Sequence, residues 1–130
     1  METKVEIRDD LKYTKEHEWI RLEGDKATMG VTDYAQKELG DVVFVELPAI
    51  GGKVEQMKSF GTIEAVKAVS DIFSPVSGEI VEVNAKLSSQ SNLINSDPYG
   101  EGWIIKIKIK NPKELDDLLS PADYRKLVGM

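Results

Sequence analysis

The sequence predicts a mainly β protein, a small sandwich or barrel of short strands with short helices at its periphery. Two observations support this prediction: apolar residues follow strand-like patterns over several short stretches, and clusters rich in Gly, Pro, Ser and Asn separate these stretches. The chain has 130 residues, which is a usual size for one domain. We therefore expect a single domain over residues 1–130.

Four stretches have the apolar patterns of strands. In 27–32, apolar residues alternate with Thr and Gly, which predicts one apolar face. The run 42–47 is almost continuously apolar and ends at Pro48, as expected for a strand buried on both faces. A shorter run, 80–83, follows a turn cluster. In 103–110, apolar residues alternate with lysines, so this strand should have one wet face.

Capping residues predict three short helices. Asp33 and Gln36 have the spacing of a capping box, and Gly40 stands where it would end that helix. Asn111 and Ser120 each precede a proline and, three residues later, an acidic residue, which predicts two helices near the C-terminus. The apolar residues of these two helices should pack onto the β-core: Leu115, Leu118, Leu119, Tyr124, Leu127 and Val128.

The composition excludes several classes of protein. Lys and Arg number 17 and Asp and Glu 23, and this net charge of −6 argues against a sequence-independent nucleic-acid binder and favours a monomer. The absence of Cys excludes disulfides and thiolate chemistry, and a single His17 excludes multi-histidine metal sites. The longest apolar run is too short for a membrane span and the N-terminus lacks a signal-peptide pattern, so we expect a soluble, cytoplasmic chain.

Lys67 is the candidate functional residue. It lies between Val66 and Ala68 with extended stretches on both sides, and no Asn-Gly or Asp-Gly pair supplies the usual turn. A lysine on a tight connection between strands projects into solvent, where an enzyme could reach it from several directions. That geometry suits a covalently attached swinging arm. The alternative is an ordinary surface lysine, as most of the 17 basic residues must be.

The stretch Gly61–Asp71, with the sequence GTIEAVKAVSD, resembles the lipoyl-lysine motif of the glycine cleavage system H-protein family. Lys67 stands where this family carries its lipoate. Other blocks are also similar and occur in the family's order: 13–19, 31–36, 39–48, 74–79 and 97–103. The resemblance extends from about Leu11 to the C-terminus. Two places depart from it, namely Ala65 in place of the usual serine and the turn 56–58 in place of Gly followed by an acidic residue.

The resemblance implies a lipoyl-domain-like fold, a barrel-sandwich hybrid of two antiparallel sheets with short peripheral helices, two of them at the C-terminus. It implies a lipoyl-binding core over about 26–108, an N-terminal extension over 1–12 and C-terminal helices over about 112–128. The residues beside Lys67 argue against other carriers. Biotin carriers resemble Met-Lys-Met at this point, and lipoyl domains of 2-oxoacid dehydrogenases resemble Asp-Lys-Ala.

The function that the resemblance implies is that of a non-catalytic carrier, with (R)-lipoate in amide linkage to Lys67. A glycine decarboxylase (the P protein) would pass an aminomethyl group to the carrier. The T protein, an aminomethyltransferase, would move the methylene to tetrahydrofolate, and the L protein would reoxidise the dithiol with NAD. A lipoate ligase or a lipoyl/octanoyl transferase would attach the lipoate. Neither a nucleic acid nor a membrane is an expected partner.

The resemblance also implies site residues around the arm. Glu64, Val66, Ala68 and Asp71 would form the hairpin around the lysine. The family folds the loaded arm into a surface cleft, and Glu18 and Asp71 match carboxylate positions on that cleft. A carboxylate in a partly dry groove holds a protonated amine through a charge-assisted hydrogen bond. The alternative is that both carboxylates are ordinary surface charges.

Three other functions remain open from the sequence. A lipoyl donor that passes lipoate to 2-oxoacid dehydrogenase subunits needs the same Lys67 hairpin. A non-covalent interaction module predicts an unmodified chain that tolerates Lys67→Ala in every assay. A small hydrolase centred on His17 lacks a nucleophile motif such as Gly-x-Ser-x-Gly.

Overall fold

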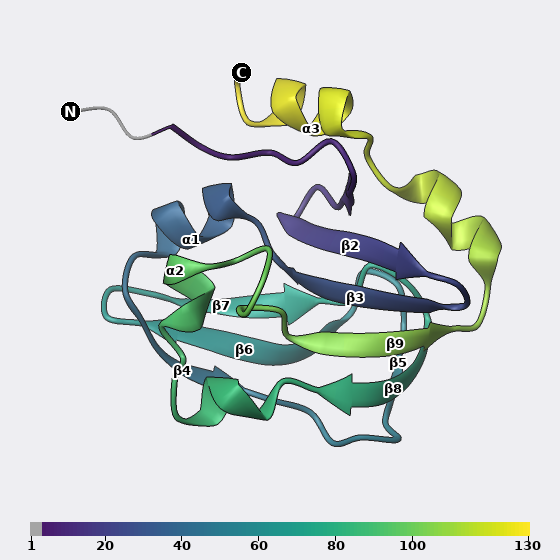
Figure 1. The fold of residues 1–130 in the computed structure, drawn as a ribbon, viewed down its shortest axis with the longest axis horizontal. Coiled ribbons are helices and arrows are strands. Elements are labelled where there is room, and N and C mark those ends of the chain that lie inside the picture. Colours follow the sequence, from purple (N-terminus) through teal and green to yellow (C-terminus); the bar gives the residue numbers. More distant parts are fainter. Residues whose placement is uncertain (1–3) are drawn as a thin grey trace.

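The structure is a computed structural model that describes residues 4–130, so the first three residues of the expected N-terminal extension lie outside the described part. Two antiparallel sheets of six and three strands pack face to face, with short helices around them (Figure 1). This arrangement confirms the predicted fold class, a mainly β protein of two antiparallel sheets. Within residues 4–130, no helix is long and apolar enough to cross a membrane.

The larger sheet has the strand order β1-β2-β3-β9-β8-β5. Its strands are β1 (Lys12–Tyr13), β2 (Glu18–Glu23), β3 (Lys26–Val31), β5 (Lys53–Val54), β8 (Gly78–Val83) and β9 (Ile105–Ile109). The smaller sheet has the order β4-β6-β7, with β4 (Val42–Glu46), β6 (Ser59–Ala65) and β7 (Val69–Phe73). In β9, buried Ile105 and Ile107 alternate with the more exposed Lys106 and Lys108, which confirms the predicted wet face. The two apolar inner faces form one core.

The prediction that the run 42–47 is buried on both faces is wrong. Val42 and Val45 are buried, but Val43 and Phe44 are 56% and 49% exposed. The register of β4 against β6 shifts between Val42 and Phe44, which marks a β-bulge. A bulge inserts an extra residue into a strand, and here two adjacent apolar side chains are left exposed. The smaller sheet therefore has an apolar outer surface near one end of β4.

The helices are α1 (Asp33–Leu39), α2 (Leu93–Ser96) and α3 (Pro121–Leu127), with 3-10 helices at Ala85–Ser88 and Pro112–Asp117. Gly40 ends α1 as predicted, but the N-cap is Thr32, whose Oγ1 accepts a hydrogen bond from the backbone N–H of Ala35. Asn111 and Ser120 are N-caps as predicted, although the first of these two helices is of the 3-10 type. Leu127 is 49% exposed, so its predicted packing onto the core is wrong.

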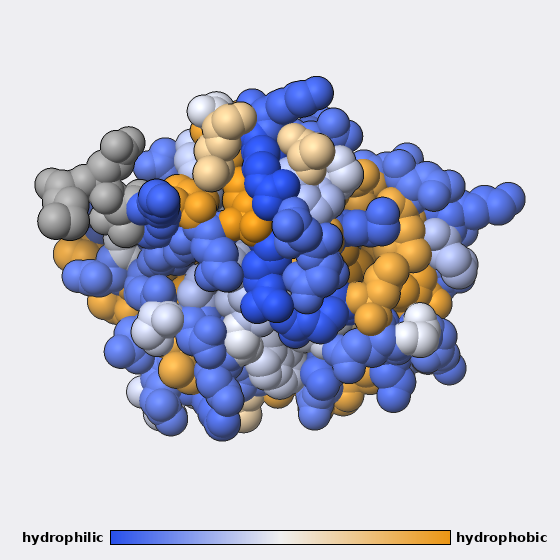
Figure 2. Space-filling model, turned by 45° about the horizontal axis from the view of Figure 1, so that its top comes forward, coloured by the Kyte–Doolittle hydropathy of each residue, from blue (hydrophilic) through white to orange (hydrophobic). Residues whose placement is uncertain are grey.

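A second, largely aromatic core lies beside the main one, under α3 and the N-terminal segment, which run next to each other (Figure 1). The outer surface on this side is mostly hydrophilic, with hydrophobic side chains in separate patches (Figure 2). The ring of Tyr124 stacks on that of Tyr13 at 4.5 Å between centroids. The Tyr124 Oη lies 2.9 Å from His17 Nδ1 and 2.7 Å from Thr32 Oγ1. Tyr124 therefore ties α3 both to the turn before β2 and to the start of α1.

We expect Tyr124→Phe to lower the free energy of unfolding by about 1–3 kcal/mol, because it leaves Thr32 Oγ1 and His17 Nδ1 without this partner. Urea unfolding followed by fluorescence measures the change. The matched control is Tyr34→Phe, which removes a solvent-exposed hydrogen bond to Glu38 and should change stability by less than about 0.5 kcal/mol. Equal losses in the two variants would contradict the role given to Tyr124.

Candidate functional site

Lys67 lies at the exposed tip of the hairpin that joins β6 to β7. The backbone N–H of Ala65 donates to the carbonyl of Ala68 at 2.7 Å, so only Val66 and Lys67 lie between the paired residues. Neither of these two residues has a positive φ, so the turn differs from the usual two-residue hairpin turns. This conformation explains why the turn contains neither Asn-Gly nor Asp-Gly. Val66 is 76% exposed, and Lys67 and Ala68 are exposed beside it.

A surface cleft of about 290 Å³ lies near this hairpin, between β2, α1 and β7, one of the two edge strands of the smaller sheet. Its apolar walls come from Ala35 and Leu39 of α1 and from Ile63 of β6. Its acidic side chains are Glu16, Glu18, Glu38 and Asp71. Among the described residues that line the cleft, none is Lys or Arg, and burial lowers the pKa of His17, which also lines the cleft, and so favours its neutral form. The cleft therefore offers a negative environment to a cation.

Glu18 is the buried carboxyl of this cleft, with only 1% of its surface exposed. Glu18 is the first residue of β2 and pairs with Val31 of β3. Its Oε1 accepts a hydrogen bond from Thr14 Oγ1 at 2.5 Å, and its Oε2 accepts one from the backbone N–H of Phe73 at 3.3 Å. Burial disfavours the charged form more than these bonds favour it, and raises the pKa of Glu18 from 4.5 to about 8. Glu18 can therefore take up or release a proton near neutral pH.

The structure brings only some of the predicted site residues together. Glu18 and Asp71 line the same cleft, although they are 53 residues apart in the sequence. Glu64 lies elsewhere: it pairs with Phe44 and with Val69, and all three side chains are exposed on the outer face of the smaller sheet. Val66 is at the tip of the hairpin together with Lys67.

The contribution of α1 to the cleft was not predicted from the sequence. Tyr34, Ala35, Glu38 and Leu39 all line it, whereas we expected this helix only as a peripheral element. The signal was present in their spacing, because residues four positions apart lie on the same face of a helix. The pairs 34/38 and 35/39 have that spacing. Nothing in the spacing alone indicated that this face turns toward a cleft.

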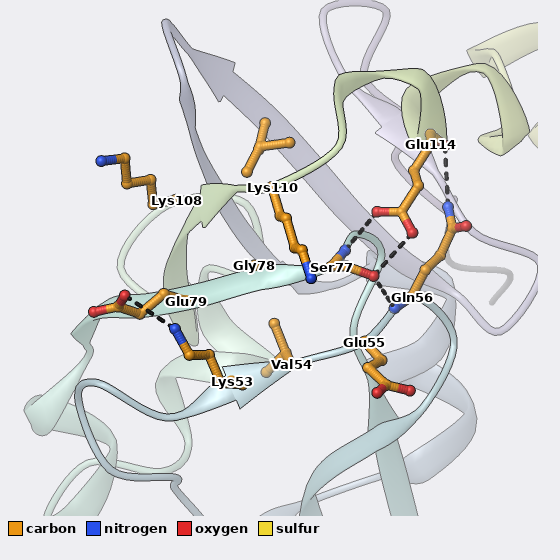
Figure 3. Close-up of a pocket in the computed structure, with 11 residues that line it drawn as sticks. Lys53, Val54, Glu55, Gln56, Ser77, Gly78, Glu79, Lys108, Lys110 and Glu114 are labelled. Atoms are coloured by element: carbon orange, nitrogen blue, oxygen red, sulfur yellow. Dashed lines mark hydrogen bonds and ion pairs between the residues drawn. The ribbon is translucent and has the colours of Figure 1, made fainter.

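A larger groove of about 930 Å³ lies between β5, β8, β9 and the 3-10 helix Pro112–Asp117 (Figure 3). None of the predicted site residues lines it. Here the Glu114 carboxylate accepts hydrogen bonds from the backbone N–H of Ser77 at 2.7 Å and from Ser77 Oγ at 2.8 Å. Gln56 Nε2 donates to the carbonyl of Glu114 at 3.0 Å. Glu114 thus fastens the C-terminal segment to the turn before β8. Within residues 4–130, no group of three or more His, Asp or Glu could hold a metal ion.

Comparisons with known proteins agree with this geometry. The family model described as "Glycine cleavage H-protein" matches residues 11–129. The glycine cleavage system H protein of Carboxydothermus hydrogenoformans is 55% identical over 122 residues, which cover 94% of each chain. The mitochondrial one of Flaveria trinervia is 56% identical over 120 residues, covering 92% of this chain and 73% of that protein.

A solved structure shares the fold as well. The crystal structure of a glycine cleavage system H protein from Mycobacterium marinum superposes with a TM-score of 0.85 at 37% identity, covering 95% of this chain and 100% of that one. The family match covers the hairpin, the cleft and the C-terminal helix alike. The chain therefore belongs to the glycine cleavage H-protein family.

Proposed function

We propose that this chain is a covalent lipoyl carrier of the glycine cleavage system, with lipoate attached to Lys67. The observation that supports this most directly is the position of Lys67, an exposed amine at the tip of a tight hairpin, in a chain of this family. The residues present suit the group. An accessible amine is what an amide linkage needs, and the nearby cleft combines apolar walls with acidic side chains. When bound, lipoate would supply a disulfide that is reduced and opened as the transferred group is accepted; release of that group would leave a dithiol, which the L protein would reoxidise.

On this proposal the chain is not itself an enzyme. It carries the aminomethyl group of glycine from the P protein to the T protein, and the L protein then reoxidises it. A tethered arm replaces three encounters with a free cofactor by visits of one carrier, which raises the effective concentration. A lipoate ligase or a lipoyl/octanoyl transferase attaches the lipoate, and the carrier works as a monomer.

We assign Glu18 and Asp71 the role of holding the protonated amine of the carried group. Both line the cleft, and each carboxyl oxygen of Glu18 accepts one hydrogen bond that helps to fix its position. An arriving cation favours the ionised form of Glu18, because opposite charges at short range lower the pKa of a carboxyl group. The charge-assisted hydrogen bond that results is stronger than a neutral one. Ala35, Leu39 and Ile63 limit the access of water to the same space.

The first experiment is the intact mass of the chain after incubation with an active lipoate ligase, lipoate and ATP. We expect the parent chain to gain one lipoyl group and Lys67→Arg to gain none, because arginine keeps the charge but offers no amine for acylation. Lys108→Arg, an exposed lysine on β9, serves as the matched control and should gain one group. An unmodified parent, with the ligase active on another carrier, would refute the proposal.

Loading by the P protein then separates two kinds of carrier. A lipoylated chain that gains an aminomethyl group in the presence of glycine and the P protein is a shuttle. A lipoylated chain that stays unloaded, but passes lipoate to a 2-oxoacid dehydrogenase subunit, is a lipoyl donor.

We expect Glu18→Gln to remove a pH dependence of stability. The folded-state pKa of Glu18 is about 8 and its ordinary value is 4.5, so between these values the folded chain keeps a proton that the unfolded chain loses. The stabilisation is complete below pH 4.5 and is lost as the pH rises to about 8, by an amount on the order of 5 kcal/mol. Urea unfolding at several pH values measures it. Glu64→Gln on the outer face should keep the slope of the parent, and an unchanged slope in Glu18→Gln would count against the buried carboxyl.

A further inference from the structure

The turn between α1 and β4 lies against the hairpin tip. The backbone N–H of Val66 donates to the carbonyl of Asp41 at 2.9 Å, which joins the tip to this turn. A Cβ added to Gly40 would lie 3.2 Å from Lys67 Cε and 3.8 Å from both Cδ and Nζ. The lysine stem therefore passes over a backbone position that has no side chain. A larger residue at this position would push on the stem.

The same turn leads from the hairpin to the cleft. Gly40 is the C-cap of α1, with a φ of +82°, and its N–H donates to the carbonyl of Gln36. Leu39 and Glu38 precede it directly, and both line the cleft. A group attached to Lys67 Nζ that crosses Gly40 thus meets the cleft-facing side of α1 next. The absence of a side chain at Gly40 leaves room for this route.

The side chain of Asn95 in α2 forms hydrogen bonds with residues of this turn and of α1. Its Nδ2 donates to the carbonyl of Gly40 at 2.8 Å and to Gln36 Oε1 at 3.0 Å. Its Oδ1 accepts a hydrogen bond from the backbone N–H of Val42 at 2.9 Å. One side chain thus fixes the residues on both sides of Asp41. Since Asp41 is the residue that binds the hairpin tip, Asn95 acts on the tip through this turn.

We propose that the turn Gly40–Asp41 is a seat for the arm, which directs a group attached to Lys67 over the end of α1 and into the cleft. Gly40 contacts the stem of the arm, and Asn95 is a positioning residue that acts through the turn. The inference rests on the proposed attachment of lipoate to Lys67. It adds to that proposal the path of the arm and the residues that set it.

The contact itself is tested without lipoate. In the unmodified chain, a nuclear Overhauser effect is expected between the Hα protons of Gly40 and the Hε protons of Lys67, because the two groups are in contact. Its absence would overturn the seat whether or not Lys67 is ever acylated.

The direction of the arm is tested with Gly40→Ala, and Gly51→Ala is its matched control. Both glycines have a positive φ, +82° and +90°, so alanine is strained at both, but a Cβ at Gly51 has nothing within 4 Å. Both variants are lipoylated to completion, as shown by intact mass, and loaded by the P protein with glycine. In the parent and in Gly51→Ala, loading should shift the amide resonances of Ala35 and Leu39. In Gly40→Ala these shifts should be smaller. The carried group should then be more open to hydrolysis, so ammonia should be released from the loaded chain roughly tenfold faster, which is the size of effect expected for one overpacked contact.

Asn95→Asp keeps the test decisive if Gly40→Ala does not fold. The substitution keeps the size of the side chain but removes both donors, so the loading-dependent shifts of Ala35 and Leu39 should again shrink. Asn92→Asp at the start of α2, where the side chain makes no capping hydrogen bond, is its control and should behave like the parent. Normal shifts in both Gly40→Ala and Asn95→Asp, in chains shown to be lipoylated, would overturn the seat and leave the carrier function standing. A parent that is never lipoylated would instead refute the carrier function.

Discussion

The burial of β6 and β7 against the six-stranded sheet is the constraint on which the geometry around Lys67 depends. Ile63 and Ile72 point into the core between the sheets, and both are almost fully buried. Side chains alternate along a strand, so the residues next to Ile63 in β6 and next to Ile72 in β7 point to the surface or to the cleft. Apolar burial therefore anchors the base of the hairpin while its tip stays exposed. The hydrogen bond from the backbone N–H of Val66 to the carbonyl of Asp41 fastens the tip to the turn before β4.

The cleft brings together residues from separate elements, each of which is held for a local reason. Thr32 and Gly40 cap α1 and so fix the helix that forms one wall. Pairing with Val31 places Glu18 at the start of β2, where Thr14 and the backbone of Phe73 engage its oxygens. The carboxyl group of Glu18 is thus almost fully buried and accepts two hydrogen bonds. In such a setting, the protonation state of the group depends on the charge of a group that comes near it. Both the neutral and the charged form of Glu18 are accessible near neutral pH.

Much of the fold could be predicted from the sequence, because its patterns are local. Alternation indicated β3 and β9, and capping residues indicated α1 and α3 with errors of about one residue. The exposed face of β4 was not predicted, because the bulge leaves Val43 and Phe44 exposed although they belong to an apolar run. The short strands β1 and β5 and the single-turn helix α2 were missed because so few residues show no period.

The candidate site was predictable only in part. The resemblance indicated Lys67, Glu18 and Asp71, and the structure places the two carboxylates at one cleft. The contributions of α1, Gly40 and Asn95 depend on contacts between distant segments, as in the bonds that join Asn95 to Gly40 across 55 positions. No periodicity reports such contacts. Likewise, the sequence shows that residue 18 is a glutamate but not that it is buried.

The two edges of the smaller sheet also bear on self-association. An edge strand with free backbone groups invites pairing with another chain, and β4 and β7 are both edges. The bulge in β4 breaks the regular spacing that a partner strand would need. At β7, the backbone N–H of Phe73 already donates a hydrogen bond to the carboxyl group of Glu18. A strand pairing with this edge would have to displace that buried carboxyl group. The residue that we propose to hold a cation would thus also hinder copies of the chain from joining edge to edge.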